Sequence, residues 1–263
     1  MATMTSYANG HLCWVDLMSR ERASAKAFYC GLFGWDADDQ DTQGGPPYTI
    51  FTLDGQQVAG LGEMSDEMKA SGMPPVWNSY INVVEVDAAT EKAAELGATV
   101  VMPPMDVMQA GRMAAIQDPT GAFVSFWQPL AHCGAQLVNV PNTWVWNELY
   151  TSDPETALTF FGDLFGWTFE KQAEAQHDYW IHSTGVRMNG GLMRKPPEME
   201  HVPSHWNVYF HAADLIATLA KLEELGGNIV FPPFDVSVGK IAVVTDPQGA
   251  AFCLIQMLVS VDE

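Results

Sequence analysis

Partial alternation of apolar and polar residues marks a strand near the start of the chain and another near its middle. Residues 12–18 and 144–150 follow this pattern, which has the period of a half-buried strand. After each strand, apolar residues recur three and four positions apart, as on one face of a helix. The pattern therefore predicts a strand–helix unit at the start of each half of the chain.

The two predicted helices are bounded by similar signals. In the second helix, Asp153 is a good N-cap, Pro154 takes the first helical position and Gly166 closes the helix. In the first helix we expect Ser19 as the N-cap and Gly34 as the closing glycine. The apolar faces consist of Ala23, Ala27, Phe28 and Leu32 in the first helix and Ala157, Phe160, Phe161 and Leu164 in the second.

The rest of each half repeats one order of predicted elements. Three strands are followed by a helix that glycine ends, and then by a hairpin whose turn is an Asp-Pro-x-Gly segment. The order fits either a βαβββαβ-like arrangement or two βαβββ units per half. In the first half we expect strands at 48–53, 58–62 and 77–86, a helix at 89–96 and hairpin strands at 113–117 and 122–128. In the second half we expect strands at 179–184, 186–192 and 206–212, a helix at 215–225 and hairpin strands at 241–245 and 250–257.

Three ordered landmarks show that the chain is an internal duplication. The helix ending at Trp35 recurs at Trp167, and the Asp-Pro-x-Gly turn that begins at Asp118 recurs at Asp246. Between them, a Pro-Pro pair occurs once in each half, at 103–104 and at 232–233. All three landmarks recur in the same order and at nearly the same spacing, which shrinks slightly along the chain. We therefore predict two copies of one module: a domain at 1–130, a linker at 131–141 and a second domain at 142–263.

Composition and charge narrow the classes of protein. The 263 residues are 48% hydrophobic, and a chain of this size buries about 70–75% of its unfolded surface, so disorder is excluded. The net charge of −20, with no Lys/Arg cluster, predicts no binding to nucleic acid or to anionic membranes. No apolar run reaches membrane-spanning length, and the four cysteines lack the paired spacing of a disulfide framework or a zinc ribbon. We expect a cytoplasmic protein with reduced thiols.

The motifs together resemble a known family. The helix endings Phe-Tyr-x-x-Leu-Phe-Gly-Trp and Phe-Phe-x-x-Leu-Phe-Gly-Trp, the Leu-Gly helix stop and the Asp-Pro-x-Gly turn are similar to those of the vicinal oxygen chelate superfamily. Glyoxalase I, bleomycin-resistance proteins and extradiol dioxygenases belong to it. The resemblance implies an α+β fold: tandem glyoxalase-like domains built from paired βαβββ modules, whose curved mixed sheets form cups for a ligand. One scaffold hosts many activities, so it leaves the function open.

The resemblance also implies positions for a metal, which many members hold through His, Gln or Glu on the first strand, His on the middle strand and Glu on the last. Tryptophan is not a ligand, asparagine and serine are poor ones for a transition metal, and one thiol cannot hold an ion alone. We therefore predict no metal site of the usual kind and no cofactor. Counted from the local motifs, the positions fall on Trp14, Asn78 and Ser125 in the first half and on Trp146, Asn207 and Cys253 in the second.

Strand alternation indicates which side chains share each cup with those positions. The predicted walls are aromatic with a few polar tips, which is typical of a pocket for a flat or hydrophobic small molecule. The candidate ligand-contacting residues among them are Trp14, Asp16, Asn78, Tyr80, Ser125 and Trp127 in the first half and Trp146, Glu148, Asn207, Tyr209 and Cys253 in the second.

Two carboxylates are the candidate catalytic groups. Asp16 and Glu148 are repeat equivalents, and a carboxylate inside an aromatic cup has a raised pKa and can act as a general acid or base. The alternative is that each faces water or caps neighbouring backbone.

Histidine and cysteine offer weaker candidates. Cys253 near His205 or His211 would form a nucleophile pair, although a buried inert thiol is the commoner outcome. His205 and His211, together with His201, are too far apart along a strand to share one ion. His182 and Arg187 on the second sheet could bind an anionic group, although we expect them to be ordinary polar residues at the surface.

Two functions of different class follow. The first is a metal-independent lyase, isomerase or hydroxylase-like enzyme of small-molecule secondary metabolism, with Asp16 or Glu148 handling protons. The alternative is a non-catalytic sequestering protein of the bleomycin-resistance type. A small molecule is the expected partner, and the chain is expected to be a monomer or a homodimer.

Overall fold

The computed structural model describes residues 3–173 and 177–258 of the chain. The first half contains β1 (Leu12–Ser19), α1 (Arg22–Phe33), β2 (Asp36–Gln40), β3 (Tyr48–Leu53), β4 (Gln56–Glu63), α2 (Asp66–Ala70), β5 (Val76–Asn82), α3 (Val86–Glu95), β6 (Thr99–Val107), β7 (Gly111–Gln117) and β8 (Phe123–Pro129). The second half contains β9 (Trp144–Thr151), α4 (Pro154–Phe165), β10 (Thr168–Lys171), β11 (Tyr179–Thr184), β12 (Arg187–Arg194), the 3₁₀-helix η1 (Pro197–Met199), β13 (His205–His211), α5 (Leu215–Glu224), β14 (Asn228–Val236), β15 (Gly239–Thr245) and β16 (Ala251–Met257).

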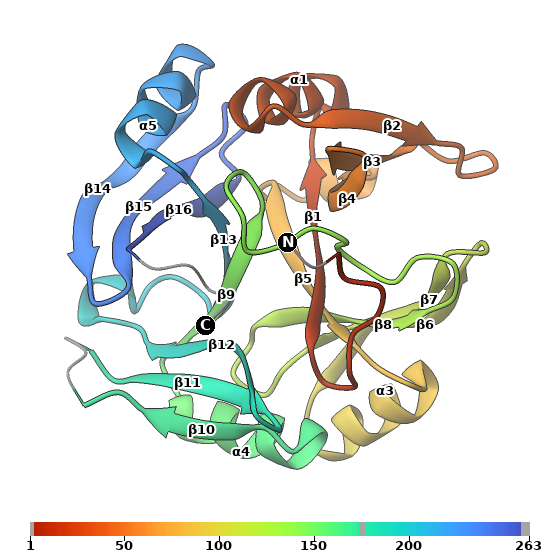
Figure 1. The fold of residues 1–263 in the computed structure, drawn as a ribbon. Helices are drawn as coiled ribbons and strands as arrows, with labels where there is room; N and C mark the ends of the chain where they lie inside the picture. The colour runs from red at the N-terminus through yellow and green to blue at the C-terminus, as the bar shows by residue number, and fades with distance from the viewer. Residues whose placement is uncertain (1–2, 174–176, 259–263) are drawn as a thin grey trace.

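Each half of the chain forms its own eight-stranded mixed sheet (Figure 1). The order is β2-β3-β4-β1-β5-β8-β7-β6 in the first sheet and β10-β11-β12-β9-β13-β16-β15-β14 in the second. In both sheets two βαβββ modules meet at their first strands, which pair antiparallel as β1 with β5 and β9 with β13. Of the two orders that the sequence left open, the structure has two βαβββ units per half.

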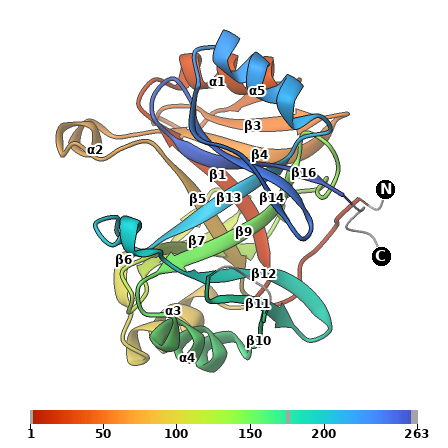
Figure 2. The same ribbon diagram turned by 90° about the vertical axis from the view of Figure 1, so that its left-hand side faces the viewer.

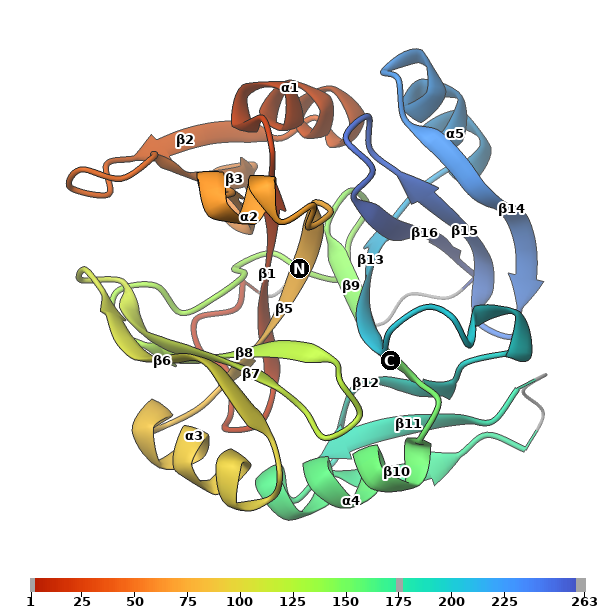
Figure 3. The same cartoon turned by 180° about the vertical axis from the view of Figure 1, so that it is seen from behind.

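Helices cover the outer faces of the curved sheets (Figures 1 and 3). Helices from different halves also contact each other: α1 lies beside α5 at one end of the molecule, and α3 lies beside α4 at the other (Figure 2). The two domains therefore pack with their helical layers in contact. Among the described residues, no helix has both the length and the apolar character needed to cross a membrane.

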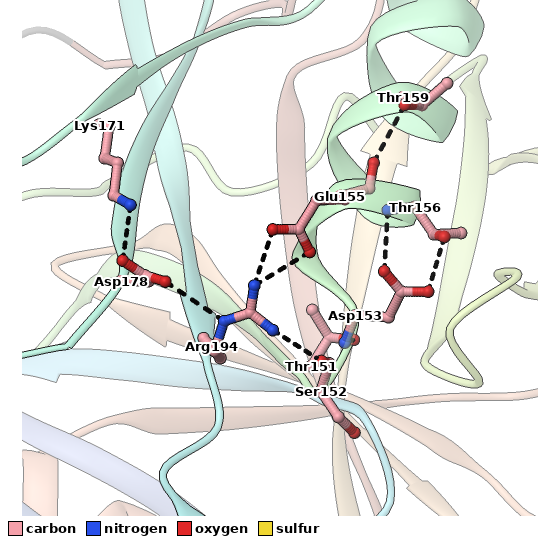
Figure 4. A network of polar contacts seen from close by, with 9 residues as sticks. All are labelled: Thr151, Ser152, Asp153, Glu155, Thr156, Thr159, Lys171, Asp178 and Arg194. Atoms are coloured by element: carbon pink, nitrogen blue, oxygen red, sulfur yellow. Dashed lines mark hydrogen bonds and ion pairs between the residues drawn. The ribbon is translucent and has the colours of Figure 1, made fainter.

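The second helix is bounded as its sequence predicts. The Asp153 carboxylate accepts hydrogen bonds from the amide and the hydroxyl of Thr156, at 3.1 and 2.7 Å, and Gly166 closes the helix with a φ of 71°. Figure 4 shows how this end is held to the sheet: the Arg194 guanidinium of β12 contacts both carboxylate oxygens of Glu155, at 2.7 and 3.0 Å. The same guanidinium contacts Asp178 at 3.3 Å.

The predicted N-cap of the first helix is wrong. Helix α1 begins after Glu21, which makes no side-chain capping bond, while Ser19 is the last residue of β1 and donates its hydroxyl to the carbonyl of Gly62. Gly34 does close the helix, with a φ of 72°. Ser19 is therefore part of β1 and does not cap the helix, although serine is a favoured N-cap residue.

The strands absent from the sequence prediction are the outer ones, β2, β6, β10 and β14. Strand β2 is fully exposed and polar, so no alternation marks it. The Pro-Pro pairs lie within β6 and β14, where the register shifts, and proline is tolerated there because each is an edge strand. The strand predicted at 77–86 is too long, because β5 ends at Asn82 and Val86 begins α3.

Contacts between β5 and α1 define the two faces of the first sheet. The Trp77 indole of β5 donates to the Tyr29 hydroxyl of α1 at 3.1 Å, so this side chain faces the helix. Because side chains alternate along a strand, Asn78 and Tyr80 point to the opposite, concave face. We call the concave face of the first sheet the first cup and that of the second sheet the second cup.

Candidate functional site

A buried carboxylate lies at the centre of the first cup. Asp16 on β1 is 3% exposed, and all its hydrogen-bond donors come from other strands of the sheet. Asn78 donates to one carboxylate oxygen at 2.8 Å, while the hydroxyls of Tyr80 and Tyr48 donate to the other at 2.9 and 3.0 Å. Burial raises the pKa of Asp16 above its ordinary value, and these hydrogen bonds oppose the shift without cancelling it.

The second cup repeats this arrangement around Glu148 on β9. The Tyr179 hydroxyl donates to one carboxylate oxygen at 2.7 Å, and the Tyr209 hydroxyl donates to the other. A further hydroxyl, that of Tyr150, lies 3.4 Å from the Tyr209 oxygen, and Asn207 is opposite Glu148 in the strand register. Burial raises the pKa of Glu148, again against the effect of its hydrogen bonds.

The tryptophans at the predicted metal positions point into the cups and bind tyrosine. The Trp14 indole donates to the Tyr48 hydroxyl at 3.1 Å, and the Trp146 indole donates to the Tyr179 hydroxyl at 3.2 Å. Each cup thus contains the same series of hydrogen bonds, from indole to phenol to carboxylate. Such a series fixes the orientation of the phenol, whose oxygen is both donor and acceptor.

Sequence reasoning missed Tyr48 and Tyr179. They begin β3 and β11, which are two strands away from the carboxylate, so only the pairing of the sheet brings them close. A signal was available, because the two tyrosines are repeat equivalents that follow the spacing of the other duplicated landmarks.

Glycine on the intervening strand allows this approach. A Cβ atom at Gly60 would collide with the Tyr48 hydroxyl, and one at Gly191 would collide with the Tyr179 hydroxyl. The intervening glycines are also repeat equivalents. Both tyrosines therefore reach across a strand that carries no side chain at that point.

His132 is a third residue that sequence reasoning did not assign to the site. The segment after β8 places its ring edge-on against Trp14 and Trp127 of the first cup, with centroids at 4.5 and 5.6 Å. Its Nδ1 lies 2.8 Å from the Gln57 side-chain oxygen, and burial lowers the pKa of this histidine to about 4. A neutral imidazole thus covers part of the first cup.

The remaining predicted wall residues come from β8 and β16. Ser125 is opposite Tyr80 in the register, and Cys253 is opposite Tyr209. Burial, and then the nearby Glu148 carboxyl, raises the pKa of the Cys253 thiol. A thiol held protonated is a poor nucleophile, so the geometry argues against the hypothesis of a cysteine nucleophile.

His182 is not a surface residue, contrary to the expectation from the sequence. It is buried, and its ring stacks on Trp167 with a centroid distance of 3.9 Å. Burial lowers its pKa to about 3, so the ring is neutral and acts as core. The stacking partner comes from the segment after α4, which the strand pattern alone does not reveal.

The donor set does not fit the metal centre of the superfamily. At the three positions of each cup, the indole nitrogen is bound to tyrosine, the amide is neutral, and the third group is a serine or a protonated thiol. Across residues 3–173 and 177–258, no three His, Cys, Asp or Glu side chains are placed to share an ion. We therefore derive no step through a metal.

A surface hollow of about 370 Å³ lies outside both cups. It is formed where α4 meets the end of α3 and the Asp-Pro-x-Gly turn, and its acidic groups are Glu155 and Asp163. Glu155 is already paired with Arg194. The cups, with their buried carboxyls, are the better candidate sites.

Comparisons with known proteins show which family the chain resembles. The sequence model of the Glyoxalase/Bleomycin resistance protein/Dioxygenase superfamily matches residues 11–126 and 134–254. A Mycobacterium tuberculosis protein named "Putative glyoxylase CFP32" is 42% identical over 97% of this chain and 98% of its own length. The Anthracycline biosynthesis protein DauV of Streptomyces sp. strain C5 is 33% identical over 97% of this chain and 96% of its own.

The fold is also found among solved structures. A Mn(II)-bound glyoxalase from Novosphingobium aromaticivorans superimposes with a TM-score of 0.65, covering 97% of this chain and 84% of that one. The sequence identity is 15%, so the similarity concerns the fold.

Proposed function

We propose an enzymatic function for this chain, which belongs to the Glyoxalase/Bleomycin resistance protein/Dioxygenase superfamily. The enzyme would move a proton on a small aromatic or hydrophobic molecule that is held in one of the cups. The observation that carries this proposal is the pair of buried carboxyls, Asp16 and Glu148, each hydrogen-bonded by two tyrosines. Burial favours the protonated form of each carboxyl, and the phenol hydrogen bonds favour the ionised form, so the two effects oppose each other as a proton-transfer group requires.

The chemistry assigned to Glu148 is general acid–base catalysis. In its protonated form it donates its proton to a substrate oxygen, and the resulting carboxylate is stabilised by the hydroxyls of Tyr179 and Tyr209. In its ionised form it removes an acidic proton from carbon and returns it elsewhere. Both directions serve a lyase or an isomerase, and neither requires a metal. A hydroxylase-like reaction would also consume dioxygen as the oxidant, with the carboxyl only removing the proton from the substrate carbon.

The substrate class is inferred from the walls and from relatives. Aromatic side chains line both cups, with Trp14 and Trp127 buried in the first cup, and Trp146 partly buried beside the buried Tyr209 in the second. One relative, with a third of its residues identical, carries anthracycline biosynthesis in its name. We infer that this chain acts on an aromatic intermediate of secondary metabolism.

A sequestering protein of the bleomycin-resistance type is the second candidate. It is favoured by Asp16, which is 3% exposed and already accepts three hydrogen bonds at 2.8 to 3.0 Å. In a sequestering protein, this carboxylate would position the aromatic wall and transfer no proton. Such a protein would bind the molecule and leave it unchanged.

Solvent proton exchange separates the two functions. The protein is incubated in D₂O with a hydroxylated anthrone, whose ring CH₂ between the two aromatic rings is acidic, and deuterium entry is followed by mass spectrometry. We expect exchange with the unaltered chain and a loss of at least about 100-fold in Glu148→Gln, the usual size of general acid–base catalysis. Asp16→Asn is the matched variant in the first cup. Binding without exchange in all three proteins would establish sequestration.

We further infer that the chain works as a cytoplasmic monomer. The contacts of α1 with α5 and of α3 with α4 bury helical faces within one chain. Light scattering of the purified protein tests this state, and a stable dimer would contradict it.

A further inference from the structure

One end of the second cup is polar where the same end of the first cup is apolar. In the first half, Met18 of β1 is opposite Val76 of β5 in the strand register. In the second half, Tyr150 of β9 is opposite His205 of β13. The two pairs occupy equivalent places in sheets of the same strand order. The second cup therefore has a phenol and an imidazole where the first cup has two apolar side chains.

A third position at this end shows the same difference. The backbone amide of Met64 donates to the Ser19 carbonyl at 2.9 Å in the first half. In the second half Lys195 takes this place, and its amide donates to the Thr151 carbonyl at 2.9 Å. Lys195 is 4% exposed and donates its ammonium to the Val202 carbonyl; among the described residues no carboxylate forms an ion pair with it. The polar end thus extends from β12 across β9 to β13.

Tyr150 adds a third hydroxyl to the surroundings of Glu148. Two positions separate the residues on β9, so their side chains lie on the same face of the sheet. The Tyr150 hydroxyl is 3.4 Å from the hydroxyl of Tyr209, which donates to Glu148. A phenol oxygen is both donor and acceptor, so Tyr150 can donate to the oxygen whose hydrogen is bound by the carboxyl. Hydrogen bonds in such a series strengthen one another.

His205 holds Tyr150 from the opposite strand. The two rings are tilted by 45° and their centroids are 5.6 Å apart. The imidazole Nδ1 lies 2.8 Å from the Pro203 carbonyl, which can only accept, so Nδ1 carries the hydrogen and the ring orientation is fixed. Burial lowers the pKa of His205, and the nearby Lys195 ammonium lowers it as well, while the bond to Pro203 acts against both. The ring at neutral pH is therefore uncharged.

The first cup supports its carboxyl by other means. A Cβ atom at Gly62 would be 2.7 Å from the sulfur of Met18, so this side chain lies over β4. A thioether has no hydrogen to donate. Asp16 accepts an amide hydrogen from Asn78 at 2.8 Å in addition to its two phenol hydrogens. An amide in the first cup thus corresponds to a further phenol in the second.

We propose that Tyr150 is a positioning residue for proton transfer at Glu148, acting through the Tyr209 hydroxyl and held in place by His205. The proposal rests on the function proposed above and deepens it, because it assigns proton transfer to the second cup. It also names two residues that support this transfer without being the proton-transfer group. Neither has a counterpart of similar chemistry in the first cup.

Removal of the Tyr150 hydroxyl should move the titration of Glu148. The titratable groups that face this carboxyl are the phenols of Tyr150, Tyr179 and Tyr209 and the thiol of Cys253. Burial raises the pKa of Glu148, and the three phenols lower it. Tyr150→Phe should therefore raise this pKa by about 0.5–1 unit, which corresponds to the loss of one hydrogen bond.

Two measurements detect this effect. NMR of ¹³C-labelled glutamate follows the titration of Glu148 itself, and the D₂O exchange assay gives the pH at which proton removal is half-maximal. Both midpoints should move to higher pH together in Tyr150→Phe, because the carboxyl removes a proton only in its ionised form. A purely structural role of Tyr150 would change the amount of folded protein and leave both midpoints where they are.

The first half supplies a matched variant whose packing the chain already uses. Tyr150→Met/His205→Val gives the second cup the side chains that the first half packs at these positions, so it should fold and shift both midpoints upward. Met18→Leu, in the first cup, should leave them unchanged. Unchanged midpoints in Tyr150→Phe and in the double variant would overturn the proposal. Absence of exchange in the unaltered chain would refute the proposed function, and the NMR titration would still decide the role of Tyr150.

Discussion

Both cups hold a buried carboxyl in place with hydrogen bonds, but the side chains that donate these hydrogen bonds differ between the cups. The shorter Asp16 receives an amide hydrogen from Asn78 in addition to two phenol hydrogens, whereas Glu148 receives two phenol hydrogens. In both cups the phenol of β3 or β11 reaches the carboxyl only because a glycine lies between them. The glycine is therefore as necessary to the site as the residues that carry the chemistry.

Substitution of that glycine should separate the tyrosine from the carboxyl. Gly191→Ala places a methyl group against the Tyr179 hydroxyl and within 2.9 Å of the Glu148 side chain. We expect the free energy of unfolding to fall by about 1–3 kcal/mol, as overpacking does, and proton exchange to fall with it. Urea denaturation and the exchange assay measure the two effects.

A glycine in a helix provides the matched control. Gly162 of α4 has ordinary contacts around its would-be Cβ, the nearest at 3.7 Å. Gly162→Ala should raise the free energy of unfolding by about 0.5–1 kcal/mol because alanine favours the helix. If Gly191→Ala behaved in the same way, the steric role of Gly191 would be refuted.

At the scale of elements, the sequence predicts what local signals specify. Strands β3 and β11 have the predicted bounds, and Asp153 and Gly166 bound α4 as expected, because alternation and capping are local. The outer strands were not predicted. These strands do not have one buried and one exposed face, so apolar and polar residues do not alternate along them. The prolines in β6 and β14 made a strand harder still to predict there.

The site itself could be predicted only in part. Strand parity, counted from positions that the family resemblance implies, predicted that Asp16, Glu148 and the two tryptophans share the cups, and their hydrogen bonds agree with this placement. Tyr48 and Tyr179 come from paired strands, and His132 comes from the segment after β8, so their positions depend on register and on chain path. Neither property is encoded in local periodicity.

At the scale of the whole molecule, the two halves contact each other through two interfaces. These occupy equivalent positions in the duplication but differ in their hydrogen bonds. Where α1 meets the second domain, Trp77 donates to the Tyr29 hydroxyl, which donates to Asp246 at 3.3 Å. In the equivalent interface, Phe161 takes the position of Tyr29. Among the described residues, the indole nitrogen of Trp206 and one carboxylate oxygen of Asp118 are then buried without a partner.

Adding one hydroxyl group should restore the missing hydrogen bonds at the second interface. Phe161→Tyr would place an oxygen between Trp206 and Asp118, as Tyr29 does between its partners, and we expect the free energy of unfolding to rise by about 1 kcal/mol. The reciprocal change, Tyr29→Phe, should lower it by about 1–3 kcal/mol because it leaves two buried polar groups unpaired. Calorimetric unfolding measures both. A lower free energy of unfolding in Phe161→Tyr would contradict this prediction and would mean that the second interface has no room for the hydroxyl.

The protonation of Glu148 is measured most directly by its own titration. With ¹³C-labelled glutamate and Glu148→Gln to assign the signal, NMR should give a pKa above the ordinary 4.5, because burial outweighs the tyrosine hydrogen bonds. The folded chain then binds this proton more tightly than the unfolded chain. Its contribution to stability is therefore fully present below pH 4.5 and is lost as the pH rises through the folded pKa, and Glu148→Gln removes that loss. A pKa at or below 4.5 would contradict the assignment of a proton-transfer role to this buried carboxyl.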